Sequence, residues 1–259
     1  MIRSNIKKTI AIVSAITVLA SAAASATAAV NNTKTGLGAQ KTASASQYTG
    51  KTPKYIFMFI GDGMSYPQIQ TTADYYSALA DTNDNDILDS RKVLNFMTFP
   101  VAGSATTYDS TSFCPDSAST ATSLSTGHKT YSGTINMDET FTTEYETIAE
   151  KLKKQLGYKI GIVSSVNLNH ATPAAYYAHQ ASRNSYYEIS EELIESGFDY
   201  FAGGALKQTT GANGDQIDSY VLAEQAGYKV IKTQSEAEKL TAIAGGMLLA
   251  ECGSKDKEE

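Results

Sequence analysis

The stretch that decides the fold is YKIGIVSSVNLNHATPAA, residues 158–175. Its first half is a short apolar run, which predicts a buried strand from 158 to about 166, and a loop follows. The segments after it alternate in the same way, with a helix at 185–197, a strand at 198–205, a helix at 215–227 and a strand at 228–233. This alternation predicts an α/β fold whose parallel sheet is covered by helices on both faces.

The sequence before this stretch continues the pattern. The run KYIFMFIGDGM, residues 54–64, predicts another buried parallel strand that ends in a turn, and residues 66–79 predict a helix. A strand is expected at 99–108 and helical structure at about 118–125. Residues 142–157 predict an amphipathic helix that a glycine ends.

Length and charge limit the possible functions. A chain of 259 residues favours one domain and permits two. The formal charge of −6 and the lack of a Lys/Arg cluster argue against nucleic acid, because phosphate backbones are met by basic surfaces. An acidic enzyme can still bind phosphate if metal ions supply the positive charge.

The N-terminus has the pattern of a secretory signal. Basic residues precede the apolar run TIAIVSAITVLA and the small residues that follow it, so residues 1–28 are expected to be a signal peptide. A membrane anchor, which needs about 20 apolar residues, fits less well. Residues 29–52 predict a flexible leader, and 53–259 the folded domain. We therefore expect export to the periplasm, the cell envelope or the outside, with no membrane span after signal removal.

Two cysteines, Cys114 and Cys252, are too few for a disulfide scaffold. Their spacing does not indicate whether they pair.

Three loops are expected to meet at the carboxyl ends of the strands, namely 61–64, 114–119 and 167–173. Asp62 stands between two glycines at the end of an apolar run, where its carboxylate can face a defined site. The alternative is an ordinary turn aspartate that bonds its own backbone.

The second loop, CPDSAST, places Ser117 at the start of a helix. Asp116 or Ser117 can cap this helix, and its free amides and positive dipole end favour an anion. No Gly-x-Ser-x-Gly motif surrounds the serine, so a Ser-His-Asp triad is not supported. If Ser117 is a nucleophile, a metal ion is the better activator.

The third loop carries His170 and Thr172, and Arg183 follows it. The first two have metal-ligand atoms, and the planar guanidinium of the arginine suits two phosphate oxygens. The alternatives are a loop histidine bonded to backbone and a surface arginine.

Together, FIGDGM, CPDSASTATSLSTG and HATPAAYYAHQASR resemble the alkaline phosphatase family, from about residue 55 to about 246. The resemblance implies a three-layer α/β/α sandwich with a mostly parallel central sheet. It implies hydrolysis of phosphate monoesters through a phosphoserine, with two zinc ions and one magnesium ion in a complete site, and a homodimer.

Matched by motif, the resemblance assigns five residues. Ser117 is similar to the serine that becomes phosphorylated and contacts metal, and Asp62 to the carboxylate shared by magnesium and one zinc. Thr172 matches the hydroxyl of the magnesium site, and His170 stands near the same ion, in direct contact or through water. Arg183 matches the arginine that binds the phosphoryl oxygens.

The other two of the three histidines lie outside the matched ligand positions. His128 is interpreted as a loop residue and His179 as a packed or hydrogen-bonded structural residue.

The chain departs from the family at its C-terminal side. The family draws most zinc ligands and an acidic magnesium ligand from a C-terminal half that this sequence does not contain, so we expect an N-terminal portion with little activity alone. The competing hypothesis is an inactive secreted half-domain that acts as a binding or partner module. A sulfatase relative is disfavoured because CPDSA lacks the spacing and the arginine of that motif.

Overall fold

The computed structural model describes residues 52–82, 90–240 and 247–251. The chain divides into two units, Met1–Phe59 and Ile60–Glu259, and the second contains every helix and strand named below. The helices are α2 (Tyr66–Ala80), the 3₁₀ helix η1 (Asn95–Thr98), α3 (Ser117–Thr126), α4 (Ile148–Leu156), α5 (Ala171–Ala174), α6 (Tyr186–Glu195), α7 (Ser219–Gln225) and α8 (Gln234–Glu238). The strands are β1 (Gly161–Asn167), β2 (Tyr200–Gly204), β3 (Tyr228–Ile231) and β4 (Met247–Glu251).

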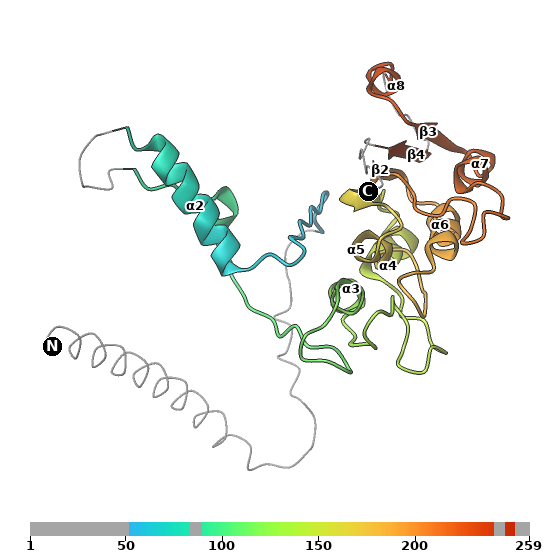
Figure 1. Ribbon diagram of the computed structural model, residues 1–259, viewed down its shortest axis with the longest axis horizontal. Coiled ribbons are helices and arrows are strands. Elements are labelled where there is room, and N and C mark those ends of the chain that lie inside the picture. The colour runs from blue at the N-terminus through green and yellow to red at the C-terminus, as the bar shows by residue number, and fades with distance from the viewer. Residues whose placement is uncertain (1–51, 83–89, 241–246, 252–259) are drawn as a thin grey trace, which may run out of the picture. The chain divides into compact units, whose positions relative to one another are not determined.

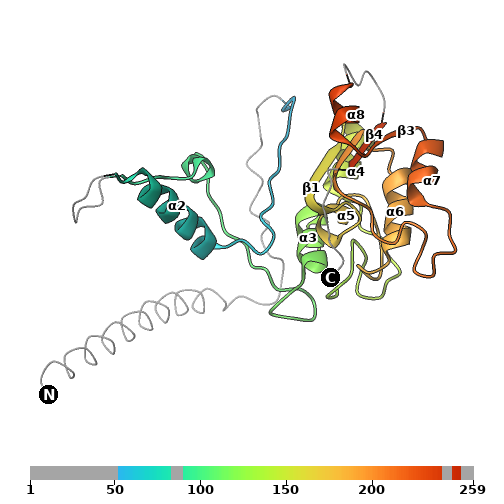
Figure 2. The same cartoon turned by 45° about the horizontal axis from the view of Figure 1, so that its top comes forward.

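The four described strands form one parallel sheet in the order β1-β2-β4-β3. In its register, Phe201 of β2 lies opposite Ile162 of β1 and Leu249 of β4. Parallel strands cannot be joined by a tight hairpin, and a helix accordingly lies between each consecutive pair in the chain. Helices flank the sheet, with α5 in contact with β1 and α7 with β3 (Figures 1 and 2). The predicted α/β fold with a parallel sheet is confirmed.

The core of this sheet is centred on Phe201, which is fully buried. Its ring centroid lies 5.4 Å from that of Tyr177, 6.1 Å from Phe198 and 6.1 Å from Tyr228. Aromatic rings bury large apolar areas, so this cluster stabilises the sheet strongly. The Tyr177 hydroxyl also donates to the carbonyl of Leu168 at 2.6 Å, which fixes the loop that leaves β1.

Two helices of the second unit have well-defined ends. In α3, the Asp116 side chain accepts from the amide of Ser119, and Gly127 ends the helix at a positive φ of 81°. In α4, Thr147 and Glu150 form a capping box. Helices α6 and α7 pack against each other, as Figure 2 also shows.

Two predicted strands are wrong. Neither 54–60 nor 99–108 belongs to a strand of the described residues, and exposed fractions reach 90% for Phe59 and 84% for Val101. An apolar run becomes a strand only where another strand supplies hydrogen-bonding partners, and the run itself does not encode that neighbour.

The helix expected at 142–157 begins only at Ile148. Glu144 instead forms an isolated antiparallel bridge with Met137, and Thr147 then caps the helix.

The expected signal peptide and residues 29–51 of the expected leader lie outside the described residues. None of the described helices has both the length and the apolar character needed to cross a membrane. Cys114 is exposed and free, and Cys252 also lies outside the described part of the chain.

Candidate active site

The Ser117 hydroxyl lies against the carboxylate of Asp62. Its Oγ is 3.0 Å from Oδ2 and 3.2 Å from Oδ1 of Asp62. Ser117 is the first residue of α3, so the positive end of the helix dipole faces the same place. A tight turn, in which the Met64 amide donates to the Gly61 carbonyl at 3.1 Å, presents Asp62. The structure thus joins two of the three loops expected to meet.

Thr172 brings in the third loop, because its Oγ1 donates to Oδ2 of Asp62 at 3.1 Å. The short helix α5 that carries it begins directly after His170. This helix stands just beyond the carboxyl end of β1, the place where ligands bind in open parallel sheets. One carboxylate therefore accepts hydrogen bonds from two hydroxyls that lie 110 and 55 positions along the chain from it.

His170 is half-buried beside this cluster. Burial lowers the pKa of its ring, the positive charges of Arg183 and Lys207 lower it further, and the negative charge of Asp62 acts in the opposite direction. The ring is therefore biased towards the neutral form, which is the form that binds metal ions.

Arg183 reaches the same helix end through Asp116. Its Nη1 donates to Oδ2 of Asp116 at 2.8 Å. Asp116 also accepts from the amides of Gly133 and Ser119, each at 3.0 Å, and from the Ser119 hydroxyl at 2.8 Å. Burial raises the pKa of Asp116, but these hydrogen bonds outweigh burial and hold it well below its usual range.

Asp109 supports this helix end and was not singled out from the sequence. It is 4% exposed and accepts from the amides of Thr111 and Ser112, at 2.8 and 2.6 Å, and its Oδ2 lies 3.0 Å from the Ser119 hydroxyl, whose single proton it shares with Asp116. The carboxylate thus ties the loop before Ser117 to the helix that begins there. Nothing in the local sequence distinguishes Asp109 from an ordinary loop aspartate.

The two other histidines lie away from Asp62. The ring of His128 stacks on Tyr145 at a centroid distance of 4.3 Å. His179 is held between Glu150 and Glu192, at 3.5 and 3.3 Å. Both interpretations, a loop histidine and a hydrogen-bonded structural histidine, agree with these contacts.

The donor set suits some metal ions better than others. The oxygens of Asp62, Ser117 and Thr172 are the hard ligands that magnesium prefers. Zinc sites instead use several nitrogen or sulfur ligands, and the described residues contain no group of three or more His, Cys, Asp or Glu side chains able to hold a metal ion. The cluster therefore fits part of a magnesium site and does not fit a pair of zinc ions.

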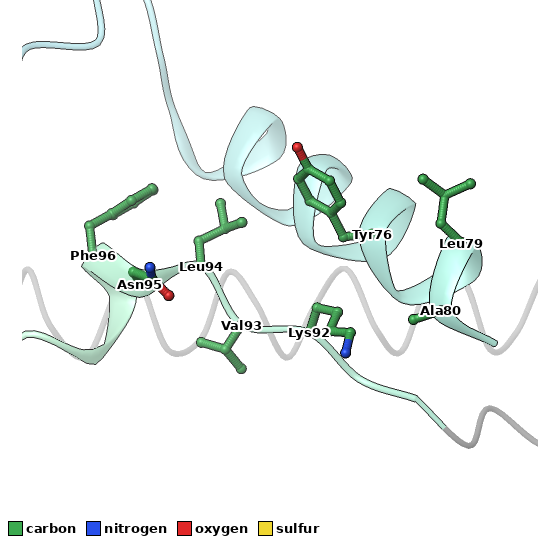
Figure 3. Close-up of a pocket in the computed structure, with 8 residues that line it drawn as sticks. All are labelled: Tyr76, Leu79, Ala80, Lys92, Val93, Leu94, Asn95 and Phe96. Atoms are coloured by element: carbon green, nitrogen blue, oxygen red, sulfur yellow. The ribbon is translucent and has the colours of Figure 1, made fainter.

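A separate hollow lies between α2 and the segment before η1 (Figure 3). Its volume is about 560 Å³, and no predicted site residue lines it. Its lining consists of Tyr76, Leu79, Ala80, Lys92, Val93, Leu94, Asn95 and Phe96.

Comparison with known proteins identifies the family. A sequence profile of the alkaline phosphatase family matches residues 53–213, which is more than half of the chain. The chain belongs to the alkaline phosphatase family. The matched region includes every residue that we named as a candidate for the site.

Characterised relatives agree. Alkaline phosphatase 4 of Bacillus subtilis is 28% identical over 204 residues, covering 76% of this chain and 42% of the relative. The tissue-nonspecific alkaline phosphatase of the rat is 32% identical over 155 residues, covering 56% of this chain and 28% of the relative. This member of the family thus spans well under half the length of either relative.

Solved structures give the same result. A cold-active alkaline phosphatase from Shewanella matches with a TM-score of 0.58 and 26% identity, over 74% of this chain and 44% of the other. A variant alkaline phosphatase of the Antarctic bacterium TAB5, solved with magnesium bound, matches with a TM-score of 0.55 and 26% identity, over 70% and 49% of the two chains. Proteins of the alkaline phosphatase family use metal ions, and the TAB5 variant is one example.

Proposed function

We propose that this chain carries the nucleophile side of a phosphomonoesterase, which hydrolyses phosphate monoesters through a phosphoserine at Ser117. The observation that carries the proposal is the hydrogen bond from Ser117 Oγ to Asp62, at a helix N-terminus within the family match. Metal dependence and the phosphoserine belong to the proposal.

The reaction has two displacements. In the first, Ser117 Oγ forms a bond to phosphorus, the ester P–O bond breaks and the alcohol leaves with a proton. In the second, water attacks the phosphoserine, inorganic phosphate leaves and the serine hydroxyl is restored. Asp62 orients the hydroxyl by accepting its hydrogen bond, and the first turn of α3 favours the anionic group.

Arg183 is proposed to bind the phosphoryl oxygens. One N–H of its guanidinium is engaged by Asp116, and a guanidinium has five donors in a fixed plane, so the same group can hold phosphate while Asp116 fixes its orientation. The low pKa of Asp116 keeps this ion pair intact through the neutral and alkaline range.

Magnesium is proposed to bind at Asp62, Thr172 and Ser117, with His170 beside it, in direct contact or through water. Such an ion supplies the positive charge that this acidic chain lacks and lowers the cost of bringing a phosphate close to two carboxylates. For a pair of zinc ions, the described residues do not supply the ligands. We therefore propose that the chain alone hydrolyses esters only at a trace level.

The remaining proposals concern location and assembly. Residues 1–28 are proposed to direct export and residues 29–52 to be a leader, with 53–259 forming the phosphatase-like domain. The location is proposed to be the periplasm, the cell envelope or the outside, and the assembly a homodimer.

A second function is an inactive binding or partner module. The lack of a zinc ligand set among the described residues favours it. The two proposed functions use the same fold, and a measurement of phosphate ester hydrolysis distinguishes them.

The test is hydrolysis of a chromogenic aryl phosphate by the purified chain with zinc and magnesium, followed by peptide mapping for phosphoserine. We expect trace turnover that Ser117→Ala removes, with phosphate on the peptide that contains Ser117. The matched control is Ser123→Ala on the same helix, whose hydroxyl donates to the Ser119 carbonyl, and it should keep the activity.

Equal turnover in the native chain and Ser117→Ala would exclude the proposed nucleophile. No turnover and no phosphoserine would favour the binding module. Fast turnover that depends on Ser117 would contradict the expected lack of zinc ligands.

A further inference from the structure

Residues 179–183 form the segment that ends at Arg183, whose side chain bonds to Asp116. Residues 133–135 are hydrogen-bonded along one side of this segment. The amides of Gln180 and Ile135 donate to each other's carbonyl groups, both at 2.9 Å, and the amide of Arg183 donates to the Gly133 carbonyl at 2.8 Å. These hydrogen bonds fix the side of the segment that faces residues 133–135. Its other side faces α4 and α6.

On that other side, Glu192 of α6 takes three hydrogen bonds from the segment. Its Oε2 accepts from the His179 amide at 2.6 Å and lies 3.3 Å from the ring Nδ1 of the same residue. Its Oε1 accepts from the Gln180 side chain at 2.6 Å. A single carboxylate on α6 thus holds two consecutive residues of the segment.

The opposite nitrogen of the His179 ring faces α4. Its Nε2 lies 3.5 Å from the carboxylate of Glu150 and 3.3 Å from the carbonyl of Tyr145. Glu150 is itself fixed by the capping box with Thr147. The charged groups that face the ring are therefore Glu150 from α4 and Glu192 from α6, and the ring side chain is 10% exposed.

We propose that Glu150, His179 and Glu192 form a charged brace that positions Arg183 on Asp116. The inference rests on the proposed function, in which Arg183 binds phosphoryl oxygens. None of the three contacts the Asp62 cluster, so they are positioning residues that act through segment 179–183.

Protonation of His179 supports the brace. Burial lowers the pKa of the ring, but the hydrogen bonds and charges of Glu150 and Glu192 outweigh burial and raise it to about 10. The ring thus stays charged in neutral and mildly alkaline solution. As the pH rises through about 10, it loses its proton, both ion pairs are lost and the segment that carries Arg183 loosens.

The test is nuclear magnetic resonance of the full chain with isotope-labelled arginine and histidine. The chain has three arginines and three histidines, and Arg183→Lys and His179→Gln assign the relevant signals. An arginine side chain does not itself titrate below about pH 12. Any step in its signal below that pH therefore reports a change in its surroundings.

We expect the His179 ring to titrate with a midpoint pH of about 10 and the Arg183 guanidinium signal to move with the same midpoint. In His179→Gln that step should be absent, while the Arg91 signal should be the same in both proteins. An Arg183 signal that stays constant while the His179 ring titrates would overturn the brace, and this result needs no carboxylate variant.

Glu192→Gln removes one charge, and Glu195→Gln removes the same charge from the exposed face of the same helix. We expect Glu192→Gln to lower the midpoint pH of the His179 and Arg183 signals by about one unit or more. Glu195→Gln should leave this midpoint nearly unchanged. Equal midpoints in both variants would exclude Glu192. These signals do not require turnover, so the brace can fail while the phosphoserine reaction stands, and the reverse.

Discussion

The two sides of the candidate site are built very differently. Asp116 accepts hydrogen bonds from two amides, one hydroxyl and Arg183, and the helix that it caps is packed into the core. Asp62 is exposed, and its carboxylate accepts from the hydroxyls of Ser117 and Thr172. One side is fixed by the fold, whereas the other consists of side chains that meet around a single carboxylate.

This difference follows from the cost of charge. A partly buried carboxylate needs several donors to remain ionised, and Asp116 has them. An exposed carboxylate keeps its hydration and needs no such support, so it remains available to a cation. We infer that the fold positions the phosphate-binding side in advance and that a bound metal ion would order the Asp62 side.

The largest expected effect comes from the fixed side. Asp116→Ala removes the cap of α3 and leaves Arg183 and the Gly133 amide without their partner, so we expect a loss of about 3 kcal/mol in the free energy of unfolding. Urea unfolding measures this loss. Asp116→Asn keeps the cap and should recover part of it, and a loss below about 0.5 kcal/mol in Asp116→Ala would contradict the comparison.

The next effect is the pH dependence of His179. Its pKa is raised to about 10 in the folded chain, above the unfolded value of about 6.5. The stabilisation is therefore complete below about pH 6.5 and is lost progressively as the pH rises from there through about 10. Unfolding measured from pH 6 to 11 should reveal this loss in the native chain and much less of it in His179→Gln; equal slopes would contradict it.

A smaller effect is expected on the exposed side. Without metal, Asp62→Ala should change the free energy of unfolding by no more than about 0.5–1 kcal/mol, because Asp62 is exposed and the hydroxyls of Ser117 and Thr172 can donate to water instead. The same urea experiment measures it. A loss as large as that of Asp116→Ala would mean that the two sides are equally fixed.

The smallest effect is expected at Phe113, in the loop just before Ser117. Phe113 is 95% exposed, so Phe113→Ala should leave the free energy of unfolding within about 0.5 kcal/mol of the native value. Phe201→Ala in the core is the matched contrast and should cost about 3–5 kcal/mol.

Sequence predicted the parts of this arrangement that depend on local pattern. The strand after residue 158 and the alternation that follows it predicted the parallel sheet, and helix-capping chemistry placed Ser117 at the start of α3. The strand expected at 54–60 is wrong because its apolar run says nothing of whether a neighbouring strand lies beside it.

Long-range pairings lay beyond sequence reasoning. Asp116 and Arg183 are 67 positions apart, and no local periodicity relates them. Glu150 and Glu192 have the pattern of ordinary helix-surface carboxylates, and only the packing of α4 and α6 places His179 between them. The sequence predicted that the loops of Asp62, Ser117 and Thr172 would meet. Only the structure showed that the Asp62 carboxylate accepts hydrogen bonds from both hydroxyls.

The most direct test of the difference between the two sides is thermal unfolding with and without magnesium, at matched ionic strength. The native chain should unfold at a higher temperature when magnesium is added. At a magnesium concentration 100 times the dissociation constant, the gain in the free energy of unfolding should be about 2.7 kcal/mol. Asp62→Ala should lose this gain, and Asp74→Ala, a change of the same charge on α2, should keep it. An equal gain in the native chain and Asp62→Ala, or no gain in either, would contradict a metal site at Asp62.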